Sequence, residues 1–411
     1  MRVLVFNPGS NSLKAGLVDS NPRARAASEN KKLIEVIVEG IGKDPKLGVY
    51  QGKAITQSQS IAGKDFKEAA ASMIQWLKDG RDGAAPELNI NNIACIGVRV
   101  VHGGDRFTGP AEMTAAVEAR IAELAQWAPL HNHRSLEILP SLRSHLPGVP
   151  IFAVFDTAFH TTTPPKAHLY AIPYELSLKH HIRRYGFHGI SHRYLLERYA
   201  TITGRDAREL KLVTMHLESG CSVTAIEKGK SVDNTMGLTP LEGLMMGTRS
   251  GDVDPALHAF LAKKEHLDLQ GIMEILEKKS GLLGVSGKSL DTRVLMRDYD
   301  TDERVRLAME MFSYRVLKAV GAFLAALGGA DAVIFGGGIA ENTSLVRKRI
   351  CEGLRWCGLV MDEEQNKNLI NVEGRLSTPD SQIQAYVIPA EEILQIAHEC
   401  CRAIAPESKS D

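Results

Sequence analysis

The sequence predicts an α/β protein built from two domains, and three observations lead to this prediction. Its 411 residues exceed the roughly 250 to 300 at which a single hydrophobic core stops growing. Apolar runs with strand character alternate with helical stretches, as expected for a parallel or mixed sheet covered by helices. Two segments, 3–19 and 211–229, each contain two β-runs joined by a polar turn, which suggests an internal duplication.

The remaining elements follow in order. After the first hairpin we expect a polar stretch at 43–63, a helix at 67–78 and the buried strand CIGVRVV. Helices at 111–127 and 136–144, the strand VPIFAVF, the second hairpin and the strand AVIF come next. Ligands bind at the carboxyl ends of strands in such sheets. Polar or small groups follow these apolar runs, which predicts one crevice lined from both halves by Asn7, Ser10, His102, Gly103, Asp156, His216 and 336–338.

Composition excludes several classes of partner. Lys plus Arg and Asp plus Glu number 49 each, so no overall charge attracts nucleic acid or an anionic membrane. Six cysteines without a C-x-x-C pair fit the reduced thiols of a cytoplasmic protein, and the apolar run before Asn7 is too short for a signal peptide. The apolar stretch 319–340 is interrupted at 328–331, which favours a buried helix followed by a strand over a membrane span.

The turn NPGSNSLK is the first chemical signal. Backbone N–H groups, hydroxyl and amide side chains and one ammonium are concentrated at Asn7, Ser10, Ser12 and Lys14, and a phosphate requires this set of donors. A polar hairpin turn with a solvated lysine has the same composition, so both interpretations stay open on this segment alone.

Two arginines lie in unusual surroundings. Arg99 is within the apolar strand VRVV, where a guanidinium needs an anion or an exit at the strand end; a structural ion pair is the alternative. Arg249 is in the loop MGTRSGDVDP, whose small residues let a planar cation approach transferred oxygens; a surface salt bridge is the alternative.

Acidic residues follow two apolar strands. Asp156 ends FAVF, a costly position unless its carboxylate coordinates a cation or accepts hydrogen bonds; an N-cap is the alternative. Glu391 and Glu392 follow AYVIPA, where oxygen ligands would suit Mg²⁺. Glutamate is also common in the first turn of any helix, because it complements the helix dipole.

A histidine pair and a glycine run complete the signals. His188 and His192 have the spacing of zinc ligands on a helix, but no Glu follows the first histidine and Gly189 weakens a helix there. We therefore favour His188 as a donor to a phosphoryl oxygen. The run VIFGGGIAEN would let a nucleotide approach the backbone, although glycine-rich strand ends are common.

Taken in order, these motifs closely resemble the acetate kinase family over residues 1–402. The matching strings include NPGSNSLK, RVVHGG, APLHN, FDTAFHTTTPP, YGFHGISH, MGLTPLEGLMMGTRSGDVDP, SGLLGVSG and GGGIAEN. The resemblance implies two duplicated ribonuclease-H-like domains of the actin-like ATPase superfamily, a nucleotide cleft between them and a homodimer. It implies an N-terminal acetate-kinase-like domain at 1–156 plus 394–411 and a C-terminal nucleotide-binding domain at 157–393.

The resemblance also implies an activity, its cofactors and its site. The activity is reversible phosphoryl transfer from ATP to acetate, giving acetyl phosphate and ADP, with Mg²⁺ or, in its place, Mn²⁺. The implied catalytic residues are Asp156, Arg99, Arg249, His188 and His131. The implied nucleotide and phosphate contacts are Asn7, Ser10, Ser12, Lys14, His216, Gly220, Asp291, Arg293, Gly338, Ile339 and Asn342. The implied acid pocket is Val101, Leu130, Phe187 and Pro240, and the implied metal ligands are Asn7 and Glu392.

Direct in-line transfer agrees with these residue types. Phosphoryl transfer needs positioning and cations around the equatorial oxygens. A carboxylate nucleophile is already ionised at neutral pH, so it needs no general base. Propionate or butyrate kinase activity is the alternative within the family, and the branched Val101 favours the shorter acids.

The chain departs from the family pattern at a few positions. His216-Leu217-Glu218-Ser219-Gly220 stands where H-L-G-N-G is usual, and a carboxylate at Glu218 would repel bound phosphates unless it turns away or meets the metal. Ala340 replaces a glycine and would crowd the nucleotide, and His133 and Ile393 also differ. A degenerate nucleotide-binding switch is therefore a further alternative.

Overall fold

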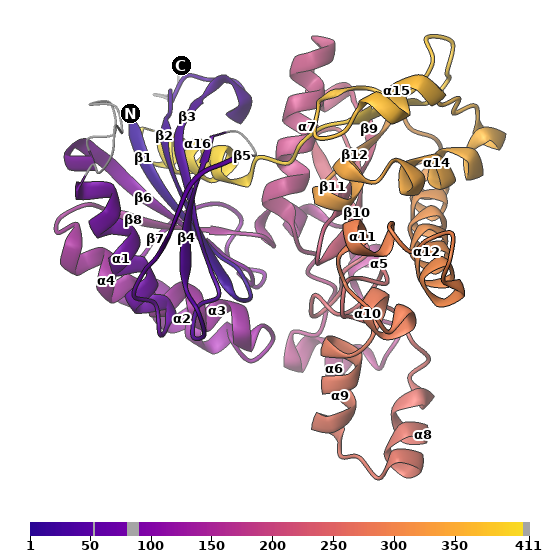
Figure 1. Ribbon diagram of the computed structural model, residues 1–411, viewed down its shortest axis with the longest axis horizontal. Helices are drawn as coiled ribbons and strands as arrows, with labels where there is room; N and C mark the ends of the chain where they lie inside the picture. The colour runs from indigo at the N-terminus through magenta and orange to yellow at the C-terminus, as the bar shows by residue number, and fades with distance from the viewer. Residues whose placement is uncertain (52–53, 80–89, 406–411) are drawn as a thin grey trace. The chain divides into compact units, whose positions relative to one another are not determined.

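The computed structural model describes residues 1–51, 54–79 and 90–405 and divides into two compact units. Unit 1 comprises Met1–Phe159, Gly189–Arg198 and Glu391–Asp411; unit 2 comprises His160–His188 and Tyr199–Ala390. The helix α7 (Gly189–Thr203) contributes to both units, whereas the domain boundaries predicted from the sequence leave it undivided. Each unit is built on its own sheet (Figure 1).

Unit 1 contains an eight-stranded sheet in the order β5-β4-β3-β2-β1-β6-β8-β7. The first hairpin supplies β1 and β2, and β1, β6 and β8 are parallel. The strands are β1 (Arg2–Pro8), β2 (Ser12–Asp19), β3 (Lys31–Glu39), β4 (Lys46–Gln51), β5 (Ala54–Ser60), β6 (Ile93–Val100), β7 (Ala111–Glu112) and β8 (Ile151–Phe155). The helices are α1 (Phe66–Asp79), α2 (Ala115–Leu124), α3 (Pro129–Glu137), α4 (Leu139–His145) and α16 (Glu392–Ile404).

Both faces of the central strands β1, β6 and β8 are largely buried, and strand alternation decides which side chains face which helices. Leu4 and Phe6 of β1 join the core cluster that includes α1. Residues of the opposite face lie against α16, since a Cβ on Gly97 would lie 2.7 Å from Ile396. By the same period of two, Asn7 of β1 and Arg99 of β6 share the face that α16 covers.

Unit 2 repeats this design with a six-stranded sheet in the order β11-β10-β9-β12-β14-β13. In each sheet, three antiparallel strands that include the hairpin are followed by two strands parallel to the first. The predicted duplication is therefore confirmed. The strands of unit 2 are β9 (Lys211–Leu217), β10 (Cys221–Glu227), β11 (Lys230–Asn234), β12 (Ala332–Gly336), β13 (Gly374–Arg375) and β14 (Gln384–Val387).

The helices of unit 2 surround this sheet. They are α5 (Pro165–His168), α6 (Tyr174–His180), α8 (Ala256–Glu265), α9 (Leu269–Lys278), α10 (Gly281–Ser286), α11 (Thr292–Leu295), α12 (Glu303–Leu327), α13 (Gly338–Asn342), α14 (Ser344–Gly353) and α15 (Glu363–Asn368). The apolar stretch 319–340 forms the end of α12 and then β12, as predicted. Within the described residues, we find no helix with the length and hydropathy needed to cross a bilayer.

Three local expectations differ from the structure. The polar stretch 43–63 forms β4 and β5, whose polar side chains are tolerated because β5 is an exposed edge strand. The helix expected at 111–127 begins only at Ala115, because 111–112 pair with β8 and Thr114 caps the helix by accepting from the Val117 amide (3.3 Å). The helix expected at 136–144 is two helices, α3 and α4, that meet at Ile138.

Candidate functional site

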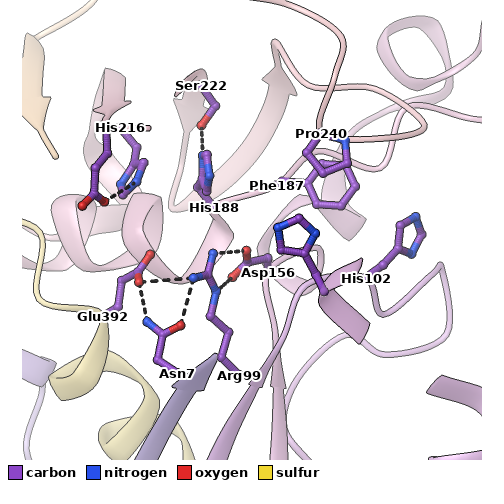
Figure 2. Close-up of polar contacts among 12 residues, drawn as sticks. Asn7, Arg99, His102, Asp156, Phe187, His188, His216, Ser222, Pro240 and Glu392 are labelled. Atoms are coloured by element: carbon purple, nitrogen blue, oxygen red, sulfur yellow. Dashed lines mark hydrogen bonds and ion pairs between the residues drawn. The ribbon is translucent and has the colours of Figure 1, made fainter. Parts of the chain in front are cut away.

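Arg99 is the centre of a polar network in unit 1 (Figure 2). Its Nε and Nη2 donate to both carboxylate oxygens of Asp156 (2.9 and 2.6 Å), and its Nη1 donates to Oδ1 of Asn7 (3.0 Å). Asn7 in turn donates from Nδ2 to Oε2 of Glu392 (2.8 Å), which lies 3.6 Å from Arg99 Nη1. The ends of three strands and the start of one helix thus bring two carboxylates, one guanidinium and one amide together.

The local fold explains these positions. Asn7 and Arg99 point to the α16 face of the sheet, and Glu392 is the first residue of α16. The Asp156 amide donates to the Val100 carbonyl (3.0 Å), which continues the parallel pairing of β6 and β8 past the end of β8.

The structure gives the partners of these acidic and basic residues. Arg99 forms a bidentate ion pair whose aspartate side chain is only 1% exposed, so Asp156 accepts hydrogen bonds from the guanidinium. Glu391 and Glu392 differ: Glu391 pairs with Lys32 (2.6 Å), whereas Glu392 joins the Arg99 network. Burial opposes a charge on Lys32, but Glu391 and Glu35 together raise its pKa.

The turn between β1 and β2 holds the predicted phosphate-loop residues. The Gly9 amide donates to the Ser12 carbonyl (2.8 Å), Ser10 is exposed, and Lys14 is paired with Asn7 in the ladder. Arg134 of α3 donates to the Gly9 carbonyl (2.8 Å) and thereby orients the turn. Sequence reasoning missed Arg134, because nothing in its local pattern reveals a contact across more than a hundred residues.

His188 and Arg249 lie next to Gly220 in unit 2, and His216 lies next to His188. The rings of His188 and His216 lie 4.3 Å apart, and His188 Nδ1 is 2.9 Å from the Ser222 hydroxyl (Figure 2). A Cβ on Gly220 would lie 3.3 Å from the His188 ring and 3.4 Å from Nη1 of Arg249. His188 has a left-handed φ of 56° immediately before α7, which turns its side chain away from the helix spiral.

Arg249 is partly buried, and no carboxylate of the described residues forms an ion pair with it. Its Nη1 donates to the Pro240 carbonyl (3.3 Å), and burial lowers the pKa of its guanidinium. The alternative of a surface salt bridge at Arg249 is therefore wrong. A partly buried guanidinium without a carboxylate partner is suited to an incoming anion.

The glycine run after β12 forms a tight turn into α13. Gly337 has φ 86°, and a Cβ there would lie 2.7 Å from the Leu217 backbone, so this position requires glycine. Asn342 Nδ2 donates to the Gly338 carbonyl (2.8 Å). Arg347 is completely buried and donates to the carbonyls of Ala340 (2.7 Å) and Glu341 (3.1 Å). These hydrogen bonds hold the turn in place.

The structure brings the other predicted nucleotide residues to this turn. The hydroxyls of Thr292 and Thr343 are 3.3 Å apart, which places α11 next to the end of α13. Asp291 caps α11 by accepting from the Arg293 amide (2.8 Å), and the two side chains also pair (2.7 Å). Ile339 is 8% exposed, so it packs mainly inward.

The predicted acid-pocket residues are divided between the units. Val101 is buried in unit 1, and Phe187 and Pro240 belong to unit 2. The side chain of Leu130 lies outside the described residues. His131 is on α3 in unit 1, where its carbonyl accepts from the Ser135 hydroxyl (3.4 Å).

The departures from the family pattern have distinct surroundings. Oε2 of Glu218 lies 3.6 Å from Nε2 of His216, so this carboxylate faces a histidine. Ala340 is fully buried in α13, at the turn that follows β12. Ile393 is also buried and packs against Gly16.

Comparisons with known proteins agree with this architecture. A family model described as the acetokinase family matches residues 2–398. The acetate kinases of Solibacter usitatus (strain Ellin6076) and Methanosarcina thermophila are each 42% identical, covering 99% and 100% of this chain and 99% and 98% of their own.

Two solved structures are similar over nearly their whole length. The acetate kinase of Porphyromonas gingivalis has a TM-score of 0.87 at 38% identity, covering 96% of this chain and 98% of its own. A propionate kinase from Francisella tularensis subsp. tularensis SCHU S4 has a TM-score of 0.86 at 36% identity, covering 97% and 98%. The chain belongs to the acetokinase family.

Proposed function

We propose that the protein is an acetate kinase, which transfers the γ-phosphoryl group of ATP reversibly to acetate and forms acetyl phosphate and ADP. One observation supports this most directly: the Arg249 guanidinium is partly buried, has no carboxylate partner among the described residues, and lies at the backbone of Gly220 beside His188. An arginine and a histidine that converge on a glycine backbone are suited to a phosphoryl group.

The reaction is an in-line displacement. An oxygen of the acetate carboxylate attacks the γ-phosphorus, the new O–P bond forms as the bond to the bridging oxygen breaks, and ADP leaves with that electron pair. Arg249 and His188 donate to the equatorial oxygens, where the negative charge is spread. Because acetate is ionised at neutral pH, no side chain has to remove a proton.

Asn7 and Glu392 are the residues that would hold Mg²⁺, or Mn²⁺ in its place. Their side-chain oxygens belong to one connected network, and Mg²⁺ commonly takes one or two protein carboxylates and completes its shell with water and substrate phosphates. A bound metal would neutralise charge on the phosphates. Asp156 keeps Arg99 oriented through two hydrogen bonds, whichever ligand is present.

Acetate is the acid that we propose, with propionate and butyrate as weaker substrates. Phe187 is buried and bulky, which limits the space for a longer acyl chain on the unit 2 side of the acid. We further propose that the enzyme is cytoplasmic and acts as a homodimer, by analogy with the family.

The test is a coupled assay with purified protein, ATP and MgCl₂. Acetyl phosphate is trapped with hydroxylamine in the forward direction, and ATP is measured from acetyl phosphate and ADP in reverse. We expect turnover in both directions, with kcat/KM for acetate above those for propionate and butyrate. Absence of acetyl phosphate in both directions would refute the activity, and a higher kcat/KM for butyrate would refute the acid preference.

A further inference from the structure

Two segments of unit 2 supply the acid-pocket residues Phe187 and Pro240, and they are joined to each other by hydrogen bonds. The Tyr185 amide donates to the Gly237 carbonyl (2.9 Å). The Phe187 amide donates to Oδ1 of Asn234, and Nδ2 of Asn234 donates to the Phe187 carbonyl (3.4 Å each). The positions of Phe187 and Pro240 are therefore determined together.

A cluster of three polar side chains holds the same two segments. Tyr170 and Arg184 both donate to the carboxylate of Glu242, each to a different oxygen. The Tyr170 hydroxyl also accepts from the Leu238 amide (2.8 Å). We refer to Tyr170, Arg184 and Glu242 as the loop clamp, because Glu242 and the Leu238 amide lie on either side of Pro240 in sequence.

Arg184 extends the clamp to the strand that precedes the loop. Its Nη2 donates to the carbonyls of Asn234 (2.7 Å) and Thr235 (3.3 Å), and Asn234 is the residue that pairs with Phe187. A single guanidinium thus contacts the beginning of the loop through two carbonyls and its end through Glu242.

The clamp is closely packed and partly removed from water. Gly237 leaves no room for a Cβ, because Glu242 and the Tyr170 hydroxyl occupy that space. Burial raises the pKa of Glu242 and that of Tyr170. Removing one member of such a cluster would leave the others without their partners, which is costly in a partly buried site.

The loop held by the clamp contacts the proposed phosphoryl site. Between Leu238 and Glu242, the Pro240 carbonyl accepts from Nη1 of Arg249 (3.3 Å). A shift of this loop would therefore move the wall of the acid pocket and a contact of the catalytic arginine. The glycine turn at α13 is held by a different group of residues, with Arg347 at its centre.

We propose that Tyr170, Arg184 and Glu242 are positioning residues that set acid affinity and acid selectivity by fixing the loop around Pro240. This inference rests on the proposed function and adds to it the residues that determine how the acid substrate is bound. It predicts that substitutions in the loop clamp change the binding of acetate and its analogues and have little effect on nucleotide binding.

The experiment compares Tyr170→Phe, Glu242→Gln and Glu242→Ala with the wild-type enzyme. For Tyr170→Phe and Glu242→Ala we expect the KM for acetate to rise about tenfold, as the loss of one or two hydrogen bonds predicts, with the KM for ATP changed by less than about twofold. The ratio of kcat/KM for acetate over propionate should fall in parallel. Glu242→Gln keeps an acceptor oxygen and should lie between wild type and Glu242→Ala.

Arg205→Gln is the matched control. Arg205 forms a more exposed ion pair with Asp331 (2.8 Å), and Asp331 accepts from the Lys211 amide at the amino end of β9. We expect this variant to leave the KM for acetate and the acid selectivity unchanged. An equal effect of Arg205→Gln would show that any lost ion pair in unit 2 suffices, which would overturn the proposal.

The remaining outcomes separate this inference from the proposed function. If the wild-type protein phosphorylates no acid, the proposed function fails. If the wild type is active and the clamp variants keep its acid KM and selectivity, the inference alone fails. Equal rises in both KM values together with a lower melting temperature would indicate a general structural role and would also overturn it.

Discussion

At the scale of single residues, Arg249 is the side chain on which the proposed reaction depends most. It has no carboxylate partner among the described residues, so its removal should affect catalysis without breaking an ion pair. We predict that Arg249→Ala lowers kcat/KM by about 10³-fold, in the range of other phosphoryl-transfer arginines. Arg249→Lys should recover only part of this loss, because an ammonium cannot donate two parallel hydrogen bonds.

Steady-state kinetics in both directions and thermal unfolding test this prediction. The melting temperature of Arg249→Ala should stay close to that of the wild type. A kcat/KM within tenfold of wild type would contradict the role of Arg249.

Glu197 offers a residue-scale prediction about stability. Burial raises its pKa to about 7, outweighing the opposite effect of Arg193, while Glu399 adds to the rise. The folded state therefore holds this proton more tightly than the unfolded state, whose carboxyl has an ordinary pKa. Between the two pKa values, the free energy of unfolding must fall as pH rises.

We predict that wild type loses about 2 kcal/mol relative to Glu197→Gln between about pH 5 and about pH 8, since glutamine resembles the protonated side chain. Urea unfolding of both proteins at several pH values measures the difference. Parallel pH profiles of the two proteins would show that Glu197 titrates normally.

At the scale of elements, the turn into α13 depends on Arg347 of α14. This buried side chain donates to the carbonyls of Ala340, Glu341 and Asn366, and burial lowers its pKa to about 10. Arg347→Leu leaves these buried acceptors without a donor, so we predict a loss of about 3 kcal/mol in the free energy of unfolding. The KM for ATP should rise as well, because the nucleotide turn loses its support.

Arg349→Leu is the control for this prediction. Arg349 lies in the same helix but pairs with Glu310 (2.9 Å), whose side chain is 47% exposed. Its loss should cost about 1 kcal/mol or less. Equal losses for Arg347→Leu and Arg349→Leu would contradict the supporting role of Arg347.

At the scale of the whole molecule, the metal should be needed for turnover and not for folding. Among the described residues we find no group of three or more metal-ligating side chains, and the network of Asn7, Arg99, Asp156 and Glu392 is already closed by its own hydrogen bonds. We predict that EDTA abolishes phosphoryl transfer and leaves the melting temperature within about 1 °C of its original value. A marked fall in melting temperature with EDTA would reveal a structural metal.

Much of the fold could be predicted because its signals are local. The two hairpins, the helix of 66–79 and the helix-then-strand at 303–336 follow from periodicity and turn residues alone. The strands β4 and β5 escaped prediction, and the polar side chains of the edge strand β5 lack the alternation of a buried strand. The delayed start of α2 depends on the pairing of 111–112 with β8 and on a single cap.

The sequence by itself determined the α/β class, the duplication and the residue types of the site, because strand alternation and polar strand ends are encoded within short windows. Tertiary structure alone decided that Arg99 is held by Asp156 and Asn7, that Glu391 and Glu392 have different partners, and that Arg249 has no carboxylate partner among the described residues. It also assembled the loop clamp from residues 170, 184 and 242. The physical reason is that an ion pair depends on the distance between two side chains in space, and the number of residues between them in the sequence does not determine that distance.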